Sequence, residues 1–431
     1  MPISSDFPQA GFPARSQIHT VSSAARGTCS EALLPSGQGH WFSAFLAGLS
    51  GWTLDAFDFF LVVLTLTAVG HEFGQDVEHM TLALTATLAF RAVGAFVFGG
   101  VADRFGRRLP MIVNLCLFAV VELATGLARN FEQFLLIRAC FGVVMGGQWG
   151  VGVSLAMEEV PARYRGVLSG LLQQGYAIGF LLASGAYFLI APAYGWRPLF
   201  YLGSVPALAA ALLVALRVPE SQAWLENRVS SFAGLGRTLR SQWKLCVYFT
   251  LFMMTMHMCS HGTQDLYPTF LQKEWGFPDR ERAAVTAISM VGAILGGLWM
   301  GRLSDRLGRR RTIVLALAGA FVVIPLWAFA HSLTLLVVGA VLIQFCVQGA
   351  WGVVPAHVAE LSPDTVRGTA PGLGNQVGVL LASVVVYLEA ALPKGRSYGF
   401  AMATTTAVVL CIAAGMTLLG QERRGIVFGK A

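Results

Sequence analysis

GVADRFGRR at residues 100–108 and GRLSDRLGRR at residues 301–310 are two nearly matching stretches of the chain. Their aspartates, Asp103 and Asp305, lie 202 positions apart. The same offset aligns further residues: Trp149-Gly150-Val151 with Trp351-Gly352-Val353, Glu158 with Glu360, Arg165-Gly166 with Arg367-Gly368, and Gln174 with Gln376. Agreement at several separated positions indicates two similar halves in parallel repeat.

Each half consists mainly of long apolar runs. The 431 residues are 55% hydrophobic and 12% charged, with a mean hydropathy of +0.63. About 20 apolar residues in a helix cross a bilayer core, and the alternating pattern of barrel strands is absent. Twelve runs qualify: 41–66, 80–101, 110–128, 131–156, 166–190, 197–216, 244–270, 282–302, 312–330, 334–357, 367–392 and 399–420. We therefore expect an all-α membrane protein with twelve transmembrane helices in two six-helix halves.

Lysine and arginine are distributed unevenly over the loops. The side that holds both termini carries 21 of them, and the opposite side carries 7. Because cytoplasmic loops are enriched in Lys and Arg, both termini are predicted to be cytoplasmic. Residues 1–39 are rich in Ser, Gly, Pro and Ala, lack a signal-peptide pattern and are predicted to form a flexible tail. The short loops and the lack of a targeting signal favour a bacterial inner membrane.

The predicted parts are that tail, two membrane halves at 40–216 and 244–420, a cytoplasmic linker at 217–243 and a cytoplasmic C-terminal tail at 421–431. The net charge of +7 follows from the loop bias, and no basic stripe points to nucleic acid. No nucleophile elbow, phosphate-binding loop or metal-ligand spacing occurs, so we expect no enzyme, cofactor or metal. A monomer in the lipid bilayer is expected.

The repeated pattern GxxxDRxGRR, between the second and third helix of each half, resembles the major facilitator superfamily. The resemblance implies a cavity between the halves that opens to one side of the membrane at a time. The charged loop residues can pair with helix ends and with glutamates, forming a cytoplasmic latch. The expected latch residues are Asp103, Arg107, Glu158, Arg165, Asp305, Arg309, Glu360 and Arg367. Alternatively, the loop arginines only set the topology.

Two aspartates and two arginines lie deep inside the first, second and fourth apolar runs. At 1.5 Å per helical residue, Asp58 and Arg138 lie about 12 Å and 10 Å deep, and Asp55 and Arg91 both lie about 16 Å deep. Since buried charges need partners, the matching depths predict two neighbouring pairs. A carboxylate that arginine holds can exchange a proton when the arginine moves away, so Asp58 is predicted to carry a coupled proton. The alternative is a permanent ion pair that fastens the helices.

A resemblance supports the first pair, because proton-coupled members of the superfamily commonly place an Asp of the first helix against an Arg of the fourth. Arg91 has a second expected use. A guanidinium offers two parallel donors and keeps its charge, so Arg91 is predicted to bind the carboxylate of an organic acid. Asp55 would be its partner in the empty protein.

Residues 257–271, HMCSHGTQDLYPTFL, bring polar groups into the seventh run. The 202 offset places His257 on Asp55, so both halves are expected to direct polar clusters at the same cavity. His261, Gln264 and Asp265 share a helical face with His257. No third histidine is in sequence reach, so zinc is not expected.

The string SHGTQDLYPT at 260–269 resembles the seventh-helix signature of Jen-type lactate and pyruvate proton symporters, in the sialate:proton symporter group. The DAFDFF string at 55–60 and Arg91 resemble that wider group. His257 stands where the signature has Asn, which leaves the exact acid open. His261 with Asp265 can hold a proton, and Gln264, Asn375 and Gln376 can bind a hydroxy or keto group. Trp149 and Trp351 are candidates for the apolar wall of the cavity, with aromatic packing as the alternative.

The sequence thus predicts proton-coupled symport of a short monocarboxylate by alternating access, with a small organic acid and a proton as partners. One alternative is a larger organic anion, such as sialate, an aromatic acid or a dicarboxylate. A drug:proton antiporter is a further alternative, but Arg91 and His261 disfavour a cationic substrate.

Overall fold

A computed structural model describes residues 40–229, 231–385 and 397–429. Within these residues the chain forms helices and connecting turns, without strands. The predicted tail at 1–39 lies outside them. The N-terminal half contains α1 His40–Phe73, α2 Val77–Phe105, α3 Arg108–Leu127, α4 Phe131–Glu159, the short η1 Ala162–Tyr164, α5 Arg165–Gln173, α6 Gly175–Tyr194 and α7 Arg197–Arg217.

The second half repeats this order after a linker. The linker contains α8 Gln222–Glu226 and α9 Phe232–Ser241. The C-terminal half contains α10 Trp243–Gln264, α11 Tyr267–Lys273, α12 Asp279–Leu307, α13 Arg309–Ala328, α14 Leu333–Leu361, η2 Asp364–Val366, α15 Thr369–Ala382 and α17 Tyr398–Leu419.

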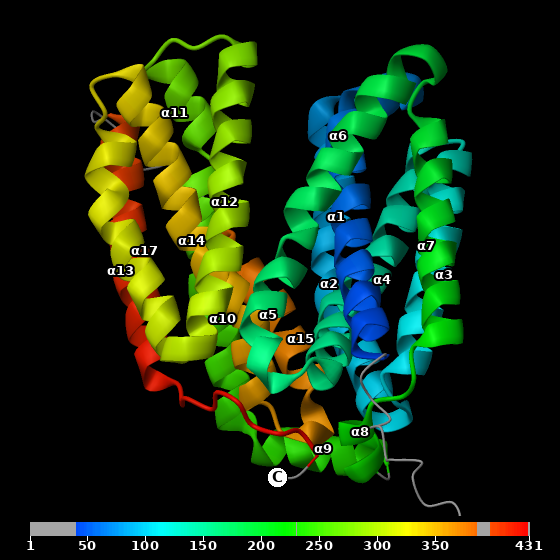
Figure 1. Ribbon diagram of the computed structural model, residues 1–431. Helices are drawn as coiled ribbons and strands as arrows, with labels where there is room; N and C mark the ends of the chain where they lie inside the picture. Colours follow the sequence, from blue (N-terminus) through cyan, green and yellow to red (C-terminus); the bar gives the residue numbers. More distant parts are fainter. Residues whose placement is uncertain (1–39, 230, 386–396, 430–431) are drawn as a thin grey trace, which may run out of the picture. The chain divides into compact units, whose positions relative to one another are not determined.

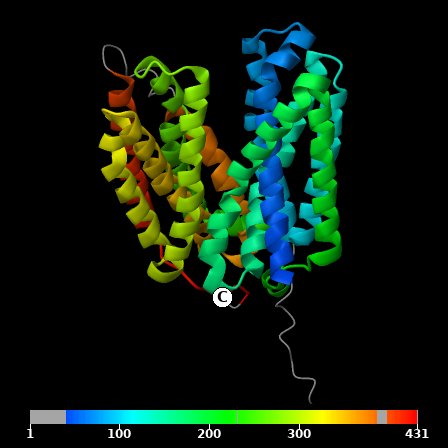
Figure 2. The same cartoon turned by 45° about the horizontal axis from the view of Figure 1, so that its top comes forward.

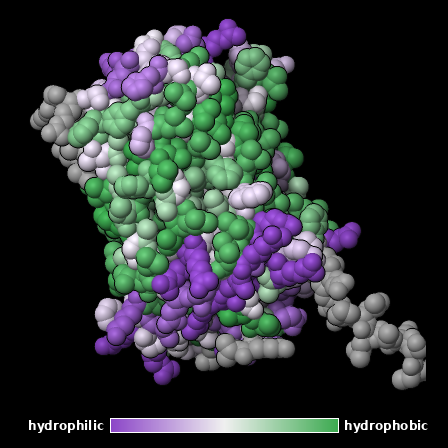
Figure 3. Space-filling view, turned by 60° about the vertical axis from the view of Figure 1, so that its left-hand side comes forward, coloured by the Kyte–Doolittle hydropathy of each residue, from purple (hydrophilic) through white to green (hydrophobic). Residues whose placement is uncertain are grey.

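Ten helical segments among the described residues are long and apolar enough to cross a membrane, and they match ten of the twelve predicted runs. The seventh run forms α10 and α11, and polar residues such as His257 and His261 lower the hydropathy of α10. The eleventh run begins in α15 and continues into residues 386–396, outside the described residues. Figure 3 shows the hydrophobic band on one face, with hydrophilic residues gathered beyond its two ends.

The structure corrects several predicted boundaries. The first helix runs to Phe73 rather than residue 66, and the ninth begins at Arg309 rather than residue 312. Helices continue past the apolar core because water and headgroups also solvate polar side chains on a helix. The fifth run divides at Gln174 into α5 and α6, and the seventh divides after Gln264.

The glycine of each repeated loop makes the turn between two long helices. Gly106 ends α2 at φ +103°, and Gly308 ends α12 at φ +101°. Residues with a Cβ rarely adopt this conformation. At each turn a glutamate accepts a hydrogen bond from a backbone N–H group at the start of the next helix. Glu220 accepts from the N–H of Arg107 at 2.7 Å, and Glu422 accepts from that of Arg310 at 2.9 Å.

Contacts between the halves involve α2, α4 and α5 on one side and α12, α14 and α15 on the other. Figures 1 and 2 show the ribbons of the two halves approaching one another at the end that carries α8 and α9, and diverging toward the opposite end. Glycines allow this approach. A Cβ on Gly99 would meet the Thr369 backbone at 2.7 Å, and one on Gly150 would meet Gly372 at 2.9 Å.

Candidate functional site

Asp103, near the end of α2, binds the beginning of α15 in the other half. Its carboxylate accepts hydrogen bonds from the backbone N–H groups of Gly368 and Thr369, each 2.8 Å long. It also accepts from the Thr369 hydroxyl at 2.6 Å. The first N–H groups of a helix lack partners within it, so a carboxylate there satisfies donors and interacts favourably with the helix dipole. Asp103 therefore couples the two halves directly.

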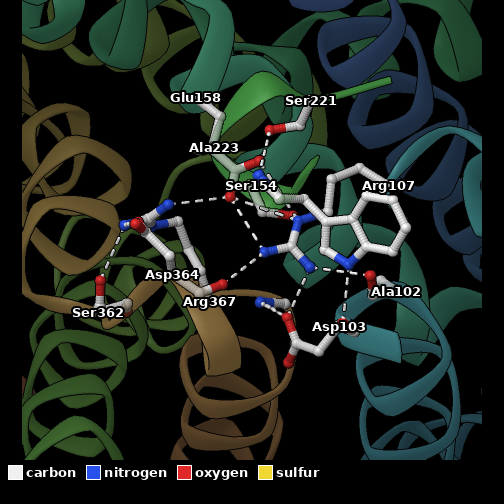
Figure 4. A network of polar contacts seen from close by, with 12 residues as sticks. Ala102, Asp103, Arg107, Ser154, Glu158, Ser221, Ala223, Ser362, Asp364 and Arg367 are labelled. Atoms are coloured by element: carbon white, nitrogen blue, oxygen red, sulfur yellow. Dashed lines mark hydrogen bonds and ion pairs between the residues drawn. The ribbon is translucent and has the colours of Figure 1, made fainter. Parts of the chain in front are cut away.

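Glu158 lies between two buried arginines, one from each half (Figure 4). The Oε1 atom of Glu158 lies 3.1 Å from Nη2 of Arg107 and 3.0 Å from Nη1 of Arg367. Arg107 also donates to Asp103 at 2.6 Å. Burial alone would lower the pKa of Arg107, but the charges of Glu158 and Asp103 outweigh it and raise that pKa above its ordinary value. The network therefore holds a charged guanidinium away from water.

The second repeated loop makes the equivalent contacts from the C-terminal half. Asp305 accepts from the backbone N–H groups of Gly166 at 2.8 Å and Val167 at 3.0 Å, where α5 begins. Arg309 donates to Asp305 at 2.7 Å and to Glu360 at 2.9 Å. All eight expected latch residues are thus brought together at the end where the halves touch.

The C-terminal segment 420–429, which the sequence did not single out, crosses this same end (Figure 1). The Phe428 ring lies between two guanidinium groups, with its centroid 4.0 Å from the central carbon of both Arg165 and Arg367. Arg165 also donates to the Ile426 carbonyl at 3.0 Å and to Glu360 at 3.1 Å. One aromatic ring of the tail therefore joins an arginine of each half.

Asp58 of α1 and Arg138 of α4 form a buried ion pair in the N-terminal half. The Arg138 Nη1 atom donates to both carboxylate oxygens of Asp58, at 2.7 and 3.0 Å. Its Nη2 atom donates to the Thr125 hydroxyl at 2.5 Å, and the guanidinium lies 4.5 Å from the Phe141 ring centroid. The first pair predicted from matched depths is in contact.

A further acidic side chain near this pair, Glu122 of α3, was missed from the sequence. It is fully buried and lies within electrostatic range of Asp58 and Arg138. An acidic residue inside the apolar run 110–128 was the available signal. An isolated position in one helix does not reveal which neighbours it will meet.

The second pair, Asp55 and Arg91, lies close enough for an electrostatic interaction without forming the expected ion pair. Asp55 is fully buried, and neither carboxylate oxygen has a hydrogen-bond partner among the described residues. The Arg91 guanidinium also lies within electrostatic range of Tyr176 of α6 and of His257 in the other half.

The C-terminal half presents a histidine cluster on α10. His257 Nε2 and the Asn375 Oδ1 atom of α15 lie 2.9 Å apart, and the His257 ring centroid is 4.7 Å from that of Trp351. One turn later, His261 Nδ1 lies 3.0 Å from Asp265 Oδ2. The His261 and Asp265 side chains are 34% and 39% exposed, so this pair is accessible. Asp265 also interacts electrostatically with Tyr176 of the other half.

Glutamines of α14 connect to this cluster, and the sequence did not single them out. Gln264 donates to Gln344 at 2.9 Å, and Gln348 donates to the Ser260 hydroxyl at 2.8 Å. Gln344 and Gln348 are four residues apart in the apolar run 334–357, a spacing that places both on one helical face. That spacing was the signal available in the sequence.

The remaining predicted residues are buried. Gln376 of α15 is 2% exposed, and neither atom of its amide group has a partner among the described residues. Trp351 donates from its indole N–H to the Met256 carbonyl at 3.0 Å. Trp149 packs in the same hydrophobic cluster as Trp52 and Met253. Trp351 belongs to the same hydrophobic cluster and also contacts the His257 ring.

A family model described as Major Facilitator Superfamily matches residues 41–264 and 265–429. The chain belongs to the Major Facilitator Superfamily. Its expected fold class is thereby confirmed, and its role is transport rather than catalysis.

Two relatives extend the superfamily assignment. The chain is 29% identical over 380 residues to a carboxylic acid transporter protein homolog of Saccharomyces cerevisiae, with 81% of this chain and 61% of the relative covered. The chain thus spans less than two thirds of that relative. It is 28% identical over 369 residues to the cis,cis-muconate transport protein of Acinetobacter baylyi, with 83% and 89% covered.

A solved Major Facilitator Superfamily structure shares the fold. The proton:xylose symporter XylE, bound to 6-bromo-6-deoxy-D-glucose, matches with a TM-score of 0.75 and 18% sequence identity. The match covers 91% of this chain and 98% of that one. Within this fold, Arg91 and Tyr176 of the N-terminal half lie within electrostatic range of His257 and Asp265, respectively, of the C-terminal half.

Proposed function

We propose that the protein is a proton-coupled symporter of a short-chain monocarboxylate of the lactate or pyruvate type. The observation that supports this most is Arg91, which is 7% exposed. Among the described residues no carboxylate lies within 4.0 Å of its guanidinium, and its Nε atom has no partner. A charge buried at membrane depth is costly unless it is balanced. A substrate carboxylate would balance it through two parallel hydrogen bonds.

The opposite half would read the rest of the substrate. Asn375 contacts His257 through Oδ1, which leaves its Nδ2 donors for a hydroxy or keto oxygen. Gln376, the next residue, has an amide group without partners. Gln264 already donates to Gln344, so its remaining capacity for the substrate is the amide oxygen and one N–H. A small acid with one carboxylate and one adjacent oxygen matches this set.

The coupled proton would use the Asp58–Arg138 pair. Protonation of Asp58 removes the charge that Arg138 binds, so the pair can separate and the helices that carry it can move. The accessible pair of His261 and Asp265 would provide a second group that binds a proton. Cotransport of one proton with one monocarboxylate moves no net charge, so a pH gradient would drive transport with little effect of voltage.

Alternating access would require the latch to open. The distribution of Lys and Arg favours cytoplasmic termini, which would make the latch end cytoplasmic and the structure outward-facing. The ion pairs of Glu158 and Glu360 with Arg367 and Arg165, which join the halves, would break when the site turns inward. A bacterial inner membrane and a monomeric state belong to the same proposal.

The yeast relative supports a carboxylic acid substrate by its name. The second candidate function is symport of a larger organic anion, since the bacterial relative is described as transporting muconate, a dicarboxylate. A dicarboxylate would need a second positive group, which a protonated His261 would supply. Sialate and aromatic acids belong to this same candidate.

The test is uptake of radiolabelled L-lactate into liposomes that contain the purified protein, with and without an inward proton gradient. Competitors would be pyruvate, acetate, succinate, cis,cis-muconate and sialate. We expect gradient-driven uptake that pyruvate blocks. Arg91→Lys keeps the charge but loses the parallel donors, so the apparent affinity should fall by about tenfold, equivalent to one good hydrogen bond.

The matched control is Arg129→Lys in the exposed α3–α4 loop, where no change is expected. Unchanged affinity in Arg91→Lys would remove Arg91 from the binding site. Uptake of muconate or sialate in place of lactate would select the second candidate.

A further inference from the structure

Glu122 is a buried acid whose surroundings leave it without a fixed partner. The side chain is 0% exposed, and neither carboxyl oxygen has a hydrogen-bond partner among the described residues. Its other side is closed by α7, because a Cβ added to Gly203 would lie 3.1 Å from the Glu122 carboxyl carbon. Burying an ionised carboxylate without hydrogen-bond partners costs free energy, so the neutral, protonated form of Glu122 is favoured.

The groups around Glu122 come from three helices. Asp58 belongs to α1, Arg138 to α4, and the uncharged Gly203 and Phe200 to α7. One guanidinium therefore faces two carboxyl groups. If both were ionised, the cluster would hold one negative charge in excess inside the membrane-spanning part of the chain, which is costly.

The hydrogen-bond donors and acceptors of the cluster also indicate that only one of its two carboxyl groups is ionised. The Glu122 carboxyl lies beside the ion pair, because Thr125, one turn further along α3, accepts from Arg138, and a Cβ on Gly203 would lie 3.1 Å from the Glu122 carboxyl carbon and 3.2 Å from the Phe57 ring. Ionised carboxylates only accept, so a hydrogen bond between Glu122 and Asp58 would require one of the two to be protonated. Arg138 uses Nη1 for Asp58 and Nη2 for Thr125, while its Nε atom has no partner. The cluster thus has a spare donor on the guanidinium and spare acceptors on Glu122.

We propose that Glu122 and Asp58 share one proton, and that Arg138 pairs with whichever of the two is ionised. In the first state Arg138 pairs with Asp58, as it does in the structure, and Glu122 carries the proton. In the other state the Glu122 O–H bond breaks and an O–H bond forms on Asp58. Glu122 then becomes the carboxylate that Arg138 binds. The cluster keeps one proton and zero net charge throughout, so the switch avoids an unpaired buried charge.

This arrangement deepens the proposed function, because it makes Glu122 the second acceptor for the coupled proton. Loss of the shared proton from the two carboxyl groups would be the step that releases the coupled proton to solvent. The shared proton itself is a property of the folded protein and does not depend on which substrate is transported.

The first test therefore needs no substrate. Infrared difference spectra of the purified protein in lipid, recorded over a pH titration, report the C=O stretch of protonated carboxyl groups. We expect a buried protonated carboxyl band in the wild type that is lost in Glu122→Gln. Asp58→Asn should alter the pH at which that band titrates. The matched control, Glu132→Gln at the exposed start of α4, should leave the band in place.

The second test separates coupling from binding. Glu122→Gln should lower proton-driven accumulation of lactate by about tenfold, the equivalent of one pKa unit, while exchange of labelled for unlabelled lactate stays within about twofold. Glu122→Asp, which restores a carboxyl group, should recover part of the accumulation. A merely structural role would impair both activities and leave the pH profile unchanged.

The outcomes are distinguishable. If Glu122→Gln, shown to be folded, retains the protonated band, or retains wild-type accumulation and pH dependence, the shared proton is refuted. If the wild type shows the band and the variant loses it, but lactate is not transported, the shared proton stands and the substrate proposal fails. If Asp58→Asn leaves the titration of the band unchanged, Asp58 is not part of the site.

Discussion

Glu158 of the N-terminal half and Arg367 of the C-terminal half form an ion pair 3.0 Å long between two side chains that are each almost fully buried. The equivalent pair joins Glu360, the repeat counterpart of Glu158, to Arg165, the counterpart of Arg367, at 3.1 Å. Each glutamate also binds an arginine of its own half. Two related clusters, each with charges from both halves, therefore hold one end of the protein together.

Replacing Glu158 with glutamine should destabilise this closed end. The change leaves the guanidinium groups of Arg107 and Arg367 buried with one carboxylate fewer, and breaking a buried pair typically costs about 3–5 kcal/mol. We expect a lower midpoint of thermal unfolding in detergent. Glu132→Gln on the same helix removes an exposed carboxylate and should leave the midpoint unchanged. Equal midpoints for the two variants would show that the pair adds nothing.

Replacing Phe428 with alanine should loosen the same end through the tail. The ring contacts one arginine of each half, and each cation–π contact contributes about 0.5–2 kcal/mol. The unfolding midpoint should fall, and protease should cleave the C-terminal tail faster. Val427→Ala is the matched control, because the Val427 side chain is 60% exposed. Cleavage of the two variants at the same rate would contradict the bridging role of Phe428.

Replacing Gly106 with alanine should be more harmful than most glycine substitutions. The backbone at Gly106 has φ +103°, and an added Cβ would collide with the Glu220 carboxylate. Occupying this conformation with a side chain costs about 1–3 kcal/mol. Gly236→Ala in α9, where nothing lies within 4 Å, should be neutral or stabilising. Denaturation midpoints that do not separate the two variants would refute the conformational argument.

Replacing His257 with asparagine should change substrate selectivity. The His257 ring contacts Asn375 and Trp351, so the shorter side chain leaves more space and removes an ionisable group from the site. The ratio of the inhibition constants of lactate and muconate should shift by about tenfold, as expected for a change in pocket volume of a few atoms. His331→Asn, in an exposed loop, is the control. An unchanged ratio would place His257 outside the specificity-determining contacts.

Much of the fold was predictable because the length of an apolar run and the repetition of a motif are visible directly in the sequence. The repeat predicted equivalent roles for Asp103 and Asp305, and each caps the first turn of a helix in the other half. Matched depth predicted that Asp58 meets Arg138, since both side chains must find a partner away from water. The same reasoning also predicted that Asp55 pairs with Arg91, but the structure shows no ion pair between them, because depth along a helix carries no information about the direction of a side chain.

Sequence alone was sufficient for the membrane helices, the two halves and the charged loops, because apolar length, repetition and the cost of burying charge act on short segments. Only the tertiary structure decided that Glu122 joins Asp58 and Arg138, that Gln344 supports Gln264, and that Phe428 lies between two arginines. Those contacts depend on how distant helices rotate and pack against each other. Such rotation is set by the sum of many side-chain contacts, and no single stretch of sequence contains it.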